Sequence, residues 1–198
     1  MKEINVKGTV RTALGKKAAR DIRKANAVPC NLYGEAKNEN GAPQALSFTA
    51  TNDELRNLIY SPDIYAVNLN IDGKECKAVL KEIQFHPVKD NVLHVDFYEI
   101  TENKPIVMEV PIKLNGLAEG VKAGGRLAAS VRKLKVKALY TNIPERLNID
   151  VTHLGLGKTI KVGELSFEGL ELITSKEVVV CQVKMTRSAR SAAAASEK

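Results

Sequence analysis

Apolar and polar residues alternate along much of this chain, and this period of two constrains its fold more than any other feature. Every second residue is apolar in residues 67–71 and again in residues 93–97. Such alternation is typical of strands with one buried face. Asp72-Gly73 directly follows the first run and is a strong hairpin signal. The sequence therefore predicts a mainly β protein.

Other segments of the first hundred residues show the same character, with two short helices between them. A strand is expected over 4–10, where Gly8 suggests a bulge, and further strands over 28–33 and 44–50. Residues 15–25 contain many helix formers and predict a short basic helix. A second helix is expected from Thr51 until before Pro62. Together these elements predict one compact, mostly β unit.

Turn formers cluster in residues 101–105, and a new strand is expected directly after them. Further strands are expected over residues 106–112, 133–138, 147–151 and 178–183, with turns at Gly116–Gly120 and Gly124-Gly125. Residues 187–198 have no core-forming pattern and predict a disordered tail. We therefore expect a first domain over 1–100, a C-terminal β-rich domain over 101–186, and the tail.

The three cysteines argue against a disulfide scaffold or a zinc site. Cys30, Cys76 and Cys181 are odd in number and far apart, so they form no metal-ligand spacing. They fit a reducing, cytosolic compartment. The apolar runs are only a few residues long, and the first residues lack the apolar stretch of a signal peptide. We expect a protein that is neither secreted nor membrane-spanning.

The distribution of charge indicates more than its total of +7. Residues 1–24 carry eight Lys and Arg against two Asp and Glu, a net of +6, whereas residues 25–100 carry six against eleven, a net of −5. Residues 101–198 carry sixteen against ten, a second +6 that is spread more evenly. A basic block beside an acidic body favours binding of a polyanion.

Motifs for catalysis or cofactor binding are missing from the sequence. It contains three histidines and no catalytic or phosphate-loop motif in its proper context. The glycines of residues 116–125 do not follow the pattern of a phosphate loop, and we interpret them as turns. We expect no enzyme activity, no cofactor and no metal.

His94 and Asp96 lie two residues apart on an expected strand, so their side chains share a face. A metal site would need a third ligand, and a general base would need a substrate pocket. A His–Asp pair in which each satisfies the other is the commoner arrangement. Contacts to base edges or ribose hydroxyls are a third possibility.

The basic helix is the sharper signal for a partner. Arg20, Arg23 and Lys24 share one helix face, and guanidinium and ammonium groups suit phosphate oxygens. A solvated amphipathic face is the commoner explanation of such a run. Because the rest of this half is acidic, the concentration of positive charge here favours nucleic acid. The alternating Lys133, Lys135 and Lys137, in contrast, are expected to serve solubility and edge protection, and RNA contact is the alternative for them.

Several motifs together resemble one family, the bacterial large-subunit ribosomal proteins that bind 5S ribosomal RNA, family twenty-five, in the longer two-domain form called Ctc or general stress protein. The resemblance extends to about residue 185. The motifs are Arg11 with Gly15-Lys16-x-Ala18-Ala19-Arg20-x-x-Arg23, Val28-Pro29-x-x-x-Tyr33-Gly34, Gln84-x-His86-Pro87, His94-Val95-Asp96-Phe97, Val110-Pro111-Ile112-x-Leu114-x-Gly116, Glu119-Gly120-Val121-Lys122-x-Gly124-Gly125 and Ile143-Pro144-Glu145.

This resemblance implies a six-stranded N-terminal β-barrel with short helices, followed by a separate C-terminal β domain. It implies a non-catalytic, cytoplasmic, ribosome-associated protein whose barrel binds an irregular, internal-loop stem of 5S rRNA, with neighbouring rRNA and proteins as further partners. The positions that match the family's RNA contacts are Arg11, Lys16, Arg20, Arg23, Tyr33, Gln84, His94 and Asp96.

Three positions depart from the family's pattern. Lys17 replaces a frequent glycine and adds a charge that we include among the RNA-binding residues, whereas Ala19 replaces a frequent serine and removes a hydroxyl. Asp21 replaces a frequent arginine and weakens the basic face. Two alternatives remain open, a tRNA- or other RNA-binding module and a stress-related interaction protein.

Overall fold

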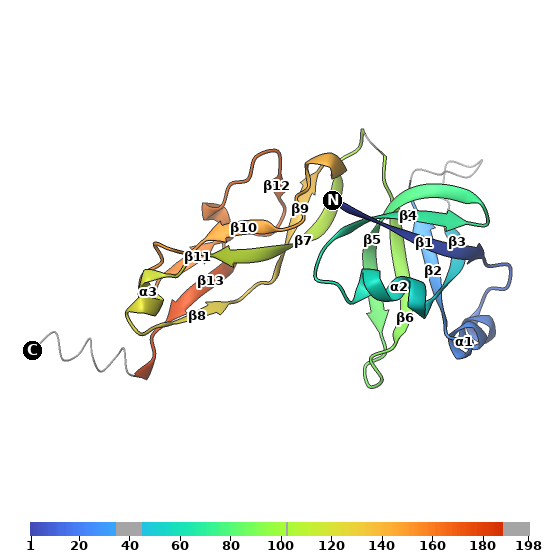
Figure 1. The fold of residues 1–198 in the computed structure, drawn as a ribbon, viewed down its shortest axis with the longest axis horizontal. Coiled ribbons are helices and arrows are strands. Elements are labelled where there is room, and N and C mark those ends of the chain that lie inside the picture. Colours follow the sequence, from blue (N-terminus) through green and yellow to red (C-terminus); the bar gives the residue numbers. More distant parts are fainter. Residues whose placement is uncertain (35–44, 102, 188–198) are drawn as a thin grey trace, which may run out of the picture. The chain divides into compact units, whose positions relative to one another are not determined.

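The computed structural model describes residues 1–34, 45–101 and 103–187, and the chain divides into two compact units, residues 1–104 and 105–198. Figure 1 shows that strands dominate both units. The loop expected over residues 34–43 and the tail expected over 187–198 lie outside the described residues, apart from Gly34 and Arg187.

The first unit is a closed six-stranded barrel, which confirms the expected fold class. Its strands follow the order β1-β3-β2-β6-β5-β4 around the barrel. Their bounds are β1 Lys2–Val10, β2 Ala27–Tyr33, β3 Leu46–Thr51, β4 Tyr65–Ile71, β5 Lys74–Phe85 and β6 Val92–Glu99.

Two of the strand pairs in the barrel are parallel and join segments that are far apart in the chain. β1 pairs with β4, and β2 pairs with β6, where Asn31 lies opposite Asp96. The remaining neighbours pair antiparallel. The parallel pairs bring residues of the first third of the chain beside residues that follow about sixty positions later.

Alternate residues of the strands fill the barrel. The largest fully buried side chains include Phe48 and Phe97, whose ring centroids lie 5.8 Å apart. Gly8 does not form the expected bulge, because β1 continues through it in register with β4. A Cβ at Gly8 would lie 2.6 Å from Cδ2 of Phe48, so close packing against this ring explains the glycine.

Helix α2, Asn52–Ile59, begins where the sequence predicts. Thr51 caps it, with its Oγ1 accepting a hydrogen bond from the Glu54 amide at 3.4 Å. Leu55 and Leu58 bury the helix against the barrel core. The expected start is confirmed, and the helix ends three residues before Pro62.

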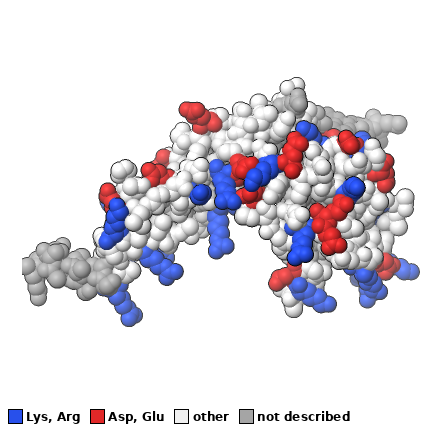
Figure 2. All heavy atoms as spheres, viewed as in Figure 1, with Lys and Arg blue, Asp and Glu red and all other residues white. Residues whose placement is uncertain are grey.

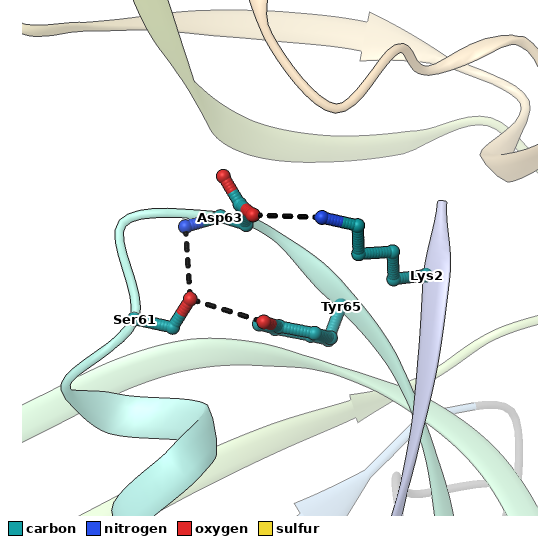
Figure 3. A network of polar contacts seen from close by, with 4 residues as sticks. All are labelled: Lys2, Ser61, Asp63 and Tyr65. Carbon is teal, nitrogen blue, oxygen red and sulfur yellow. Dashed lines mark hydrogen bonds and ion pairs between the residues drawn. The ribbon is translucent and has the colours of Figure 1, made fainter.

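A polar network holds the connection between α2 and β4 (Figure 3). The Ser61 hydroxyl lies 3.0 Å from the Tyr65 hydroxyl, and the Asp63 amide donates to the Ser61 oxygen at 3.3 Å. The Lys2 ammonium donates to the Asp63 carboxylate at 3.0 Å and thereby joins the start of β1 to this turn. The barrel is therefore tied at the end where β1 begins.

The hairpin between β4 and β5 turns at Asp72 and Gly73, as the sequence predicts. Both residues have positive φ, 50° and 87°, which is the geometry that an Asp-Gly pair favours in a two-residue turn. The Asp72 carboxylate also accepts a hydrogen bond from the Val10 amide at 2.8 Å. This bond fastens the end of β1 to the hairpin.

The second unit contains two described sheets, one with the order β10-β7-β9-β12 and one with the order β11-β13-β8. Its buried core includes Val110, Leu134, Ile149 and Val180. The elements are β7 Ile106–Asn115, α3 Glu119–Lys122, β8 Arg126–Ala129, β9 Lys133–Ala138, β10 Leu147–Asp150, β11 Thr159–Lys161, β12 Glu171–Leu172 and β13 Val179–Lys184, with 3-10 helices at Tyr140–Asn142 and Val162–Glu164.

The glycine-rich segment after β7 is not composed of turns alone. It contains α3, a single helical turn that the sequence did not predict. Gly120 within it packs against backbone, because a Cβ there would lie 2.6 Å from the Gly155 carbonyl carbon and from the Leu156 amide nitrogen. This glycine lets two backbone segments of the unit approach each other closely.

The lysine stripe of β9 faces solvent, and it pairs with acidic residues across the sheet. Lys135 lies 3.9 Å from Glu109 of β7, and Lys137 lies 3.2 Å from Glu171 of β12. The edge-protection interpretation was wrong, because β9 lies between β7 and β12 rather than at an edge. Cross-strand ion pairs are the role that the structure gives to these two lysines.

Candidate RNA-binding face

His94 and Asp96 project from the outer surface of β6 and alternate with Val95 and Phe97, which point into the barrel. His94 Nδ1 lies 3.5 Å from Asp96 Oδ1, and the two side chains keep about a fifth of their surface exposed, 19% and 21%. This distance is longer than that of a charge-assisted hydrogen bond, which is about 2.8 Å. The pair shares a face as predicted and retains capacity for further hydrogen bonds.

The neighbouring strand β5 adds two polar side chains to the same surface. Gln84 lies opposite His94, and Glu82 lies opposite Asp96. Two carboxylates directly opposite each other repel, and a hydrogen-bond donor or a cation close to them reduces this repulsion. Glu82 was not predicted as a site residue, although its spacing of two from Gln84 places both on one face.

On the other side of β6, strand β2 contributes Asn31 and Tyr33. Asn31 lies opposite Asp96, and its Oδ1 accepts a hydrogen bond from the Ser47 hydroxyl of β3 at 3.0 Å. Burial raises the pKa of the Tyr33 phenol, and the charges of Asp96 and Glu82 act in the same direction. The phenol therefore keeps its proton at neutral pH and can act as a donor.

These side chains form one continuous surface over β5, β6 and β2, which we call the polar face: Asn31, Tyr33, Glu82, Gln84, His94 and Asp96. Of these, Tyr33, Gln84, His94 and Asp96 were predicted from the sequence. Asn31 was missed because the parallel pairing of β2 with β6 could not be derived from the chain order. Glu82 was missed although its spacing from Gln84 was available in the sequence.

Helix α1, Lys16–Lys24, occupies the expected basic segment and packs against β2. None of its residues is fully buried, and Lys16, Lys17 and Arg20 are exposed. Its first turn contains no acidic residue. Two lysines at the positive end of the helix dipole are unfavourable alone, and an anion there would relieve this repulsion. Figure 2 shows Lys and Arg side chains gathered around α1.

Arg23 connects α1 to the polar face. Its Nε donates a hydrogen bond to the Leu93 carbonyl of β6 at 2.9 Å, one residue before His94. The bond uses one nitrogen of the guanidinium group, and Nη1 and Nη2 have no hydrogen-bond partner among the described residues. The cationic helix and the polar face are thus fixed next to each other.

Arg11 follows β1 and is partly buried. Its Nη2 donates to the Ala13 carbonyl at 3.4 Å, whereas its Nε is buried and has no partner within the described part of the chain. The charges of Arg11 and Asp96 both act on the Cys30 thiol, although burial is the main cause that raises the pKa of Cys30 to about 12. The Arg11 amide donates to the Ser47 carbonyl at 3.0 Å, which places Arg11 beside β3.

The structure thus brings Arg23 and the four predicted polar-face residues together. Lys16, Lys17 and Arg20 lie on the exposed part of α1, as does Asp21, which reduces its positive charge. His86 has a local role instead, because its Nδ1 accepts hydrogen bonds from the amides of Val88 and Lys89 in the β5–β6 turn.

The described residues contain neither a metal-binding cluster nor a membrane-spanning helix. They hold no group of three or more His, Cys, Asp or Glu side chains that could bind a metal ion. None of the helices that the structure describes has the length and apolar character needed to cross a membrane.

Comparison with known proteins accounts for both units. The model described as "Ribosomal L25p family" matches residues 6–97, and the model described as "Ribosomal protein TL5, C-terminal domain" matches residues 105–187. A Phocaeicola vulgatus protein named "Large ribosomal subunit protein bL25" is 67% identical over 100% of both chains. Proteins of the same name from Bacteroides thetaiotaomicron and Porphyromonas gingivalis strain W83 are 63% and 56% identical, over 100% and 98% of both chains.

The mainly β fold, with a closed barrel and a second β unit, and these full-length matches define a non-catalytic, structural protein of the large ribosomal subunit. The chain belongs to the Ribosomal L25p family and carries the TL5-type C-terminal domain in addition. This confirms the family resemblance derived from its motifs.

Proposed function

We propose that the barrel unit binds 5S ribosomal RNA through the polar face and helix α1. The observation that carries this proposal is the hydrogen bond from Arg23 to the Leu93 carbonyl, because it places a cationic helix beside a row of hydrogen-bonding side chains. Phosphate-binding and base-reading groups must lie together in this way to recognise one RNA segment. The family resemblance of the sequence motifs supports 5S rRNA as that segment.

In this proposal the cations of α1 hold the phosphate backbone. Lys16, Lys17 and Arg20 are exposed and can approach phosphate oxygens without rearrangement of the barrel. No side chain caps the helix at Gly15, so the backbone amides of the first turn, beside the two lysines, can also donate to phosphate. These groups supply affinity that depends on salt and not on sequence.

The polar face supplies discrimination. A regular RNA helix has a deep and narrow major groove that side chains cannot enter, whereas an irregular stem exposes base edges and ribose hydroxyls. Asp96 is an acceptor for base amino groups or 2′-hydroxyls, and Gln84 and Tyr33 can donate. A donor from RNA would also reduce the repulsion between Asp96 and Glu82, which lie opposite each other.

The proposed setting is the bacterial cytoplasm, on the ribosome, where the neighbours would be ribosomal RNA and other large-subunit proteins. The names of the relatives support this setting, since each is a large ribosomal subunit protein.

The test is competition between RNAs for the full chain. Labelled 5S rRNA is bound to the protein at near-physiological salt, and unlabelled 5S rRNA or tRNA is added. We expect 5S rRNA to compete and tRNA to compete only at about a hundredfold higher concentration. Footprinting should then protect an irregular stem of 5S rRNA. Equal competition by tRNA would overturn the proposal in favour of a general RNA-binding module.

A further inference from the structure

Two cations face each other on neighbouring strands of the second unit. Arg126 of β8 and Lys184 of β13 are register partners, and both side chains are exposed. Directly opposite residues of an antiparallel pair hold their Cβ atoms about 5 Å apart, and like charges at this distance are destabilising. In Figure 2 the side chains that project along β8 and at the end of β13 are blue.

The β9 lysines of the same unit differ from Arg126 and Lys184, because their charges are neutralised by nearby carboxylates. Lys135 and Lys137 each lie within 4.0 Å of a glutamate on a neighbouring strand. For Arg126 and Lys184, no carboxylate of the described residues lies within that distance. The repulsion between these two cations is therefore not compensated inside the described part of the chain.

Further positive charge lies at the same end of the unit. The Thr186 hydroxyl donates to the Gly124 carbonyl at 2.6 Å, which joins the segment after β13 to the segment between α3 and β8. Lys122 lies two residues before Gly124 and Arg187 directly follows Thr186, and both are exposed. We call Lys122, Arg126, Lys184 and Arg187 the distal basic cluster. The carboxylate of α3, Glu119, lies 3.9 Å from His153.

Protection of a sheet edge accounts for only part of this cluster. Arg126 lies on β8, which is an edge strand, and a charge there discourages pairing with another chain. Lys184 lies near the end of β13, the central strand of this sheet, where it is the register partner of Arg126 and lies beyond residues 179–182 that pair with β11. A second cation on the central strand, opposite the first, needs another explanation.

We propose that the distal basic cluster binds the phosphate backbone of ribosomal RNA in the large subunit, as a contact separate from that of the barrel. The proposal rests on the family membership and not on the proposed 5S rRNA binding. Charge complementarity favours this occupant, because phosphate would neutralise both register partners. None of the four residues is aromatic, and all four are cations of the kind that bind phosphate oxygens. It also gives a role to the second excess of positive charge.

The first experiment compares two full-length variants that each lose two positive charges. Arg126→Gln with Lys184→Gln alters the cluster, and Lys135→Gln with Lys137→Gln is the matched control. Binding is measured to large subunits that lack this protein and to isolated 5S rRNA. We expect the cluster variant to bind subunits about tenfold more weakly, and the control variant to bind like the wild type.

Both variants should retain wild-type affinity for isolated 5S rRNA, which separates this proposal from that for the barrel. A cluster variant that binds subunits normally would overturn the proposal, and so would a control variant that loses as much affinity. Loss of 5S rRNA binding in the cluster variant would contradict a separate contact.

A second experiment distinguishes RNA from an acidic protein. The photoreactive residue benzoylphenylalanine replaces Ala128, which lies two positions from Arg126 on the same face of β8. The full chain is assembled into large subunits and irradiated. We expect crosslinks to ribosomal RNA, and crosslinks to protein alone would overturn the proposal.

Discussion

Arg23 donates the hydrogen of Nε to the Leu93 carbonyl across 2.9 Å, and this bond ties helix α1 to the strand that carries His94 and Asp96. A lysine would keep the charge at this position without the fork of donors that an arginine offers. The bond uses one nitrogen of Arg23 to position the helix, and the other two have no hydrogen-bond partner among the described residues. Its neighbour Lys24 is exposed and carries the same charge.

This difference predicts distinct effects for two adjacent substitutions. Arg23→Ala should speed hydrogen exchange of the α1 amides, because the helix loses its tie to β6, whereas Lys24→Ala should leave exchange unchanged. The lost bond is worth about 1 kcal/mol, a factor of roughly five in helix opening. Mass spectrometry of the full-length variants measures the exchange. Equal exchange in both variants would show that packing alone holds the helix.

Arg20 predicts an effect on salt dependence. Its side chain is exposed on α1, so in the proposed complex it contacts phosphate and not bases. Arg20→Ala should weaken binding to 5S rRNA and to unrelated RNA by similar factors and reduce the slope of log affinity against log salt by about one. Titrations at several salt concentrations measure this slope. An unchanged slope would remove Arg20 from the phosphate contacts.

Substitution of Asp96 should affect 5S rRNA and unrelated RNA differently, in contrast to substitution of Arg20. Asp96→Asn removes the charge and keeps the shape, so a base or ribose donor loses its best acceptor. We expect affinity for 5S rRNA to fall about tenfold, and affinity for unrelated RNA to stay constant or rise, because a carboxylate repels phosphate. Glu75→Gln on β5, an exposed residue of the same unit, is the control. Equal losses for both RNAs would show that Asp96 only supports the fold.

Gly8 and Phe48 predict a coupled effect on stability. A Cβ at position 8 would lie 2.6 Å from the Phe48 ring, so Gly8→Ala should lower the free energy of unfolding of the barrel by about 2 kcal/mol. In the double variant with Phe48→Leu, which shortens the side chain, the combined loss should be smaller than the sum of the two. Urea unfolding followed by circular dichroism tests this, and simple additivity would contradict the contact.

Cys30 predicts a change in alkaline stability. Burial raises its pKa to about 12 in the folded chain, whereas a thiol in an unfolded chain ionises near about 8.5. The unfolded chain therefore loses this proton first. The stability that the buried thiol contributes is complete below the unfolded pKa and is lost as the pH rises towards about 12.

The slope of this loss is about 1.4 kcal/mol per pH unit for one group. Cys30→Ala should remove that slope, so its free energy of unfolding should fall less steeply than that of the wild type between about pH 9 and about pH 11. The comparison concerns slopes and not absolute stability, since the substitution also leaves a small void. Parallel slopes would mean that the thiol ionises in the folded barrel.

Local elements were predictable from the sequence because local chemistry determines them. The Asp72-Gly73 turn has the positive φ values that this pair favours, and Thr51 caps the helix that follows it. The parallel pairing of β2 with β6 was not predictable, because it joins residues 31 and 96 with no signal in either segment. Asn31 therefore escaped the predicted site. Similarly, Gly8 suggested a bulge because the Phe48 ring beside it is forty residues away.

The parallel pairing of β2 with β6 also determines when the barrel can close during synthesis of the chain. β6 is the last strand of the unit to leave the ribosome, and it carries His94, Asp96 and the carbonyl that holds Arg23. Pairing over such a separation in sequence also makes folding slow compared with local hairpins. A nascent chain that has emerged only as far as β5 has the cations of α1 without the polar face. If the polar face selects among RNAs as proposed, the chain therefore acquires its positive charge first and its selectivity only when the barrel closes.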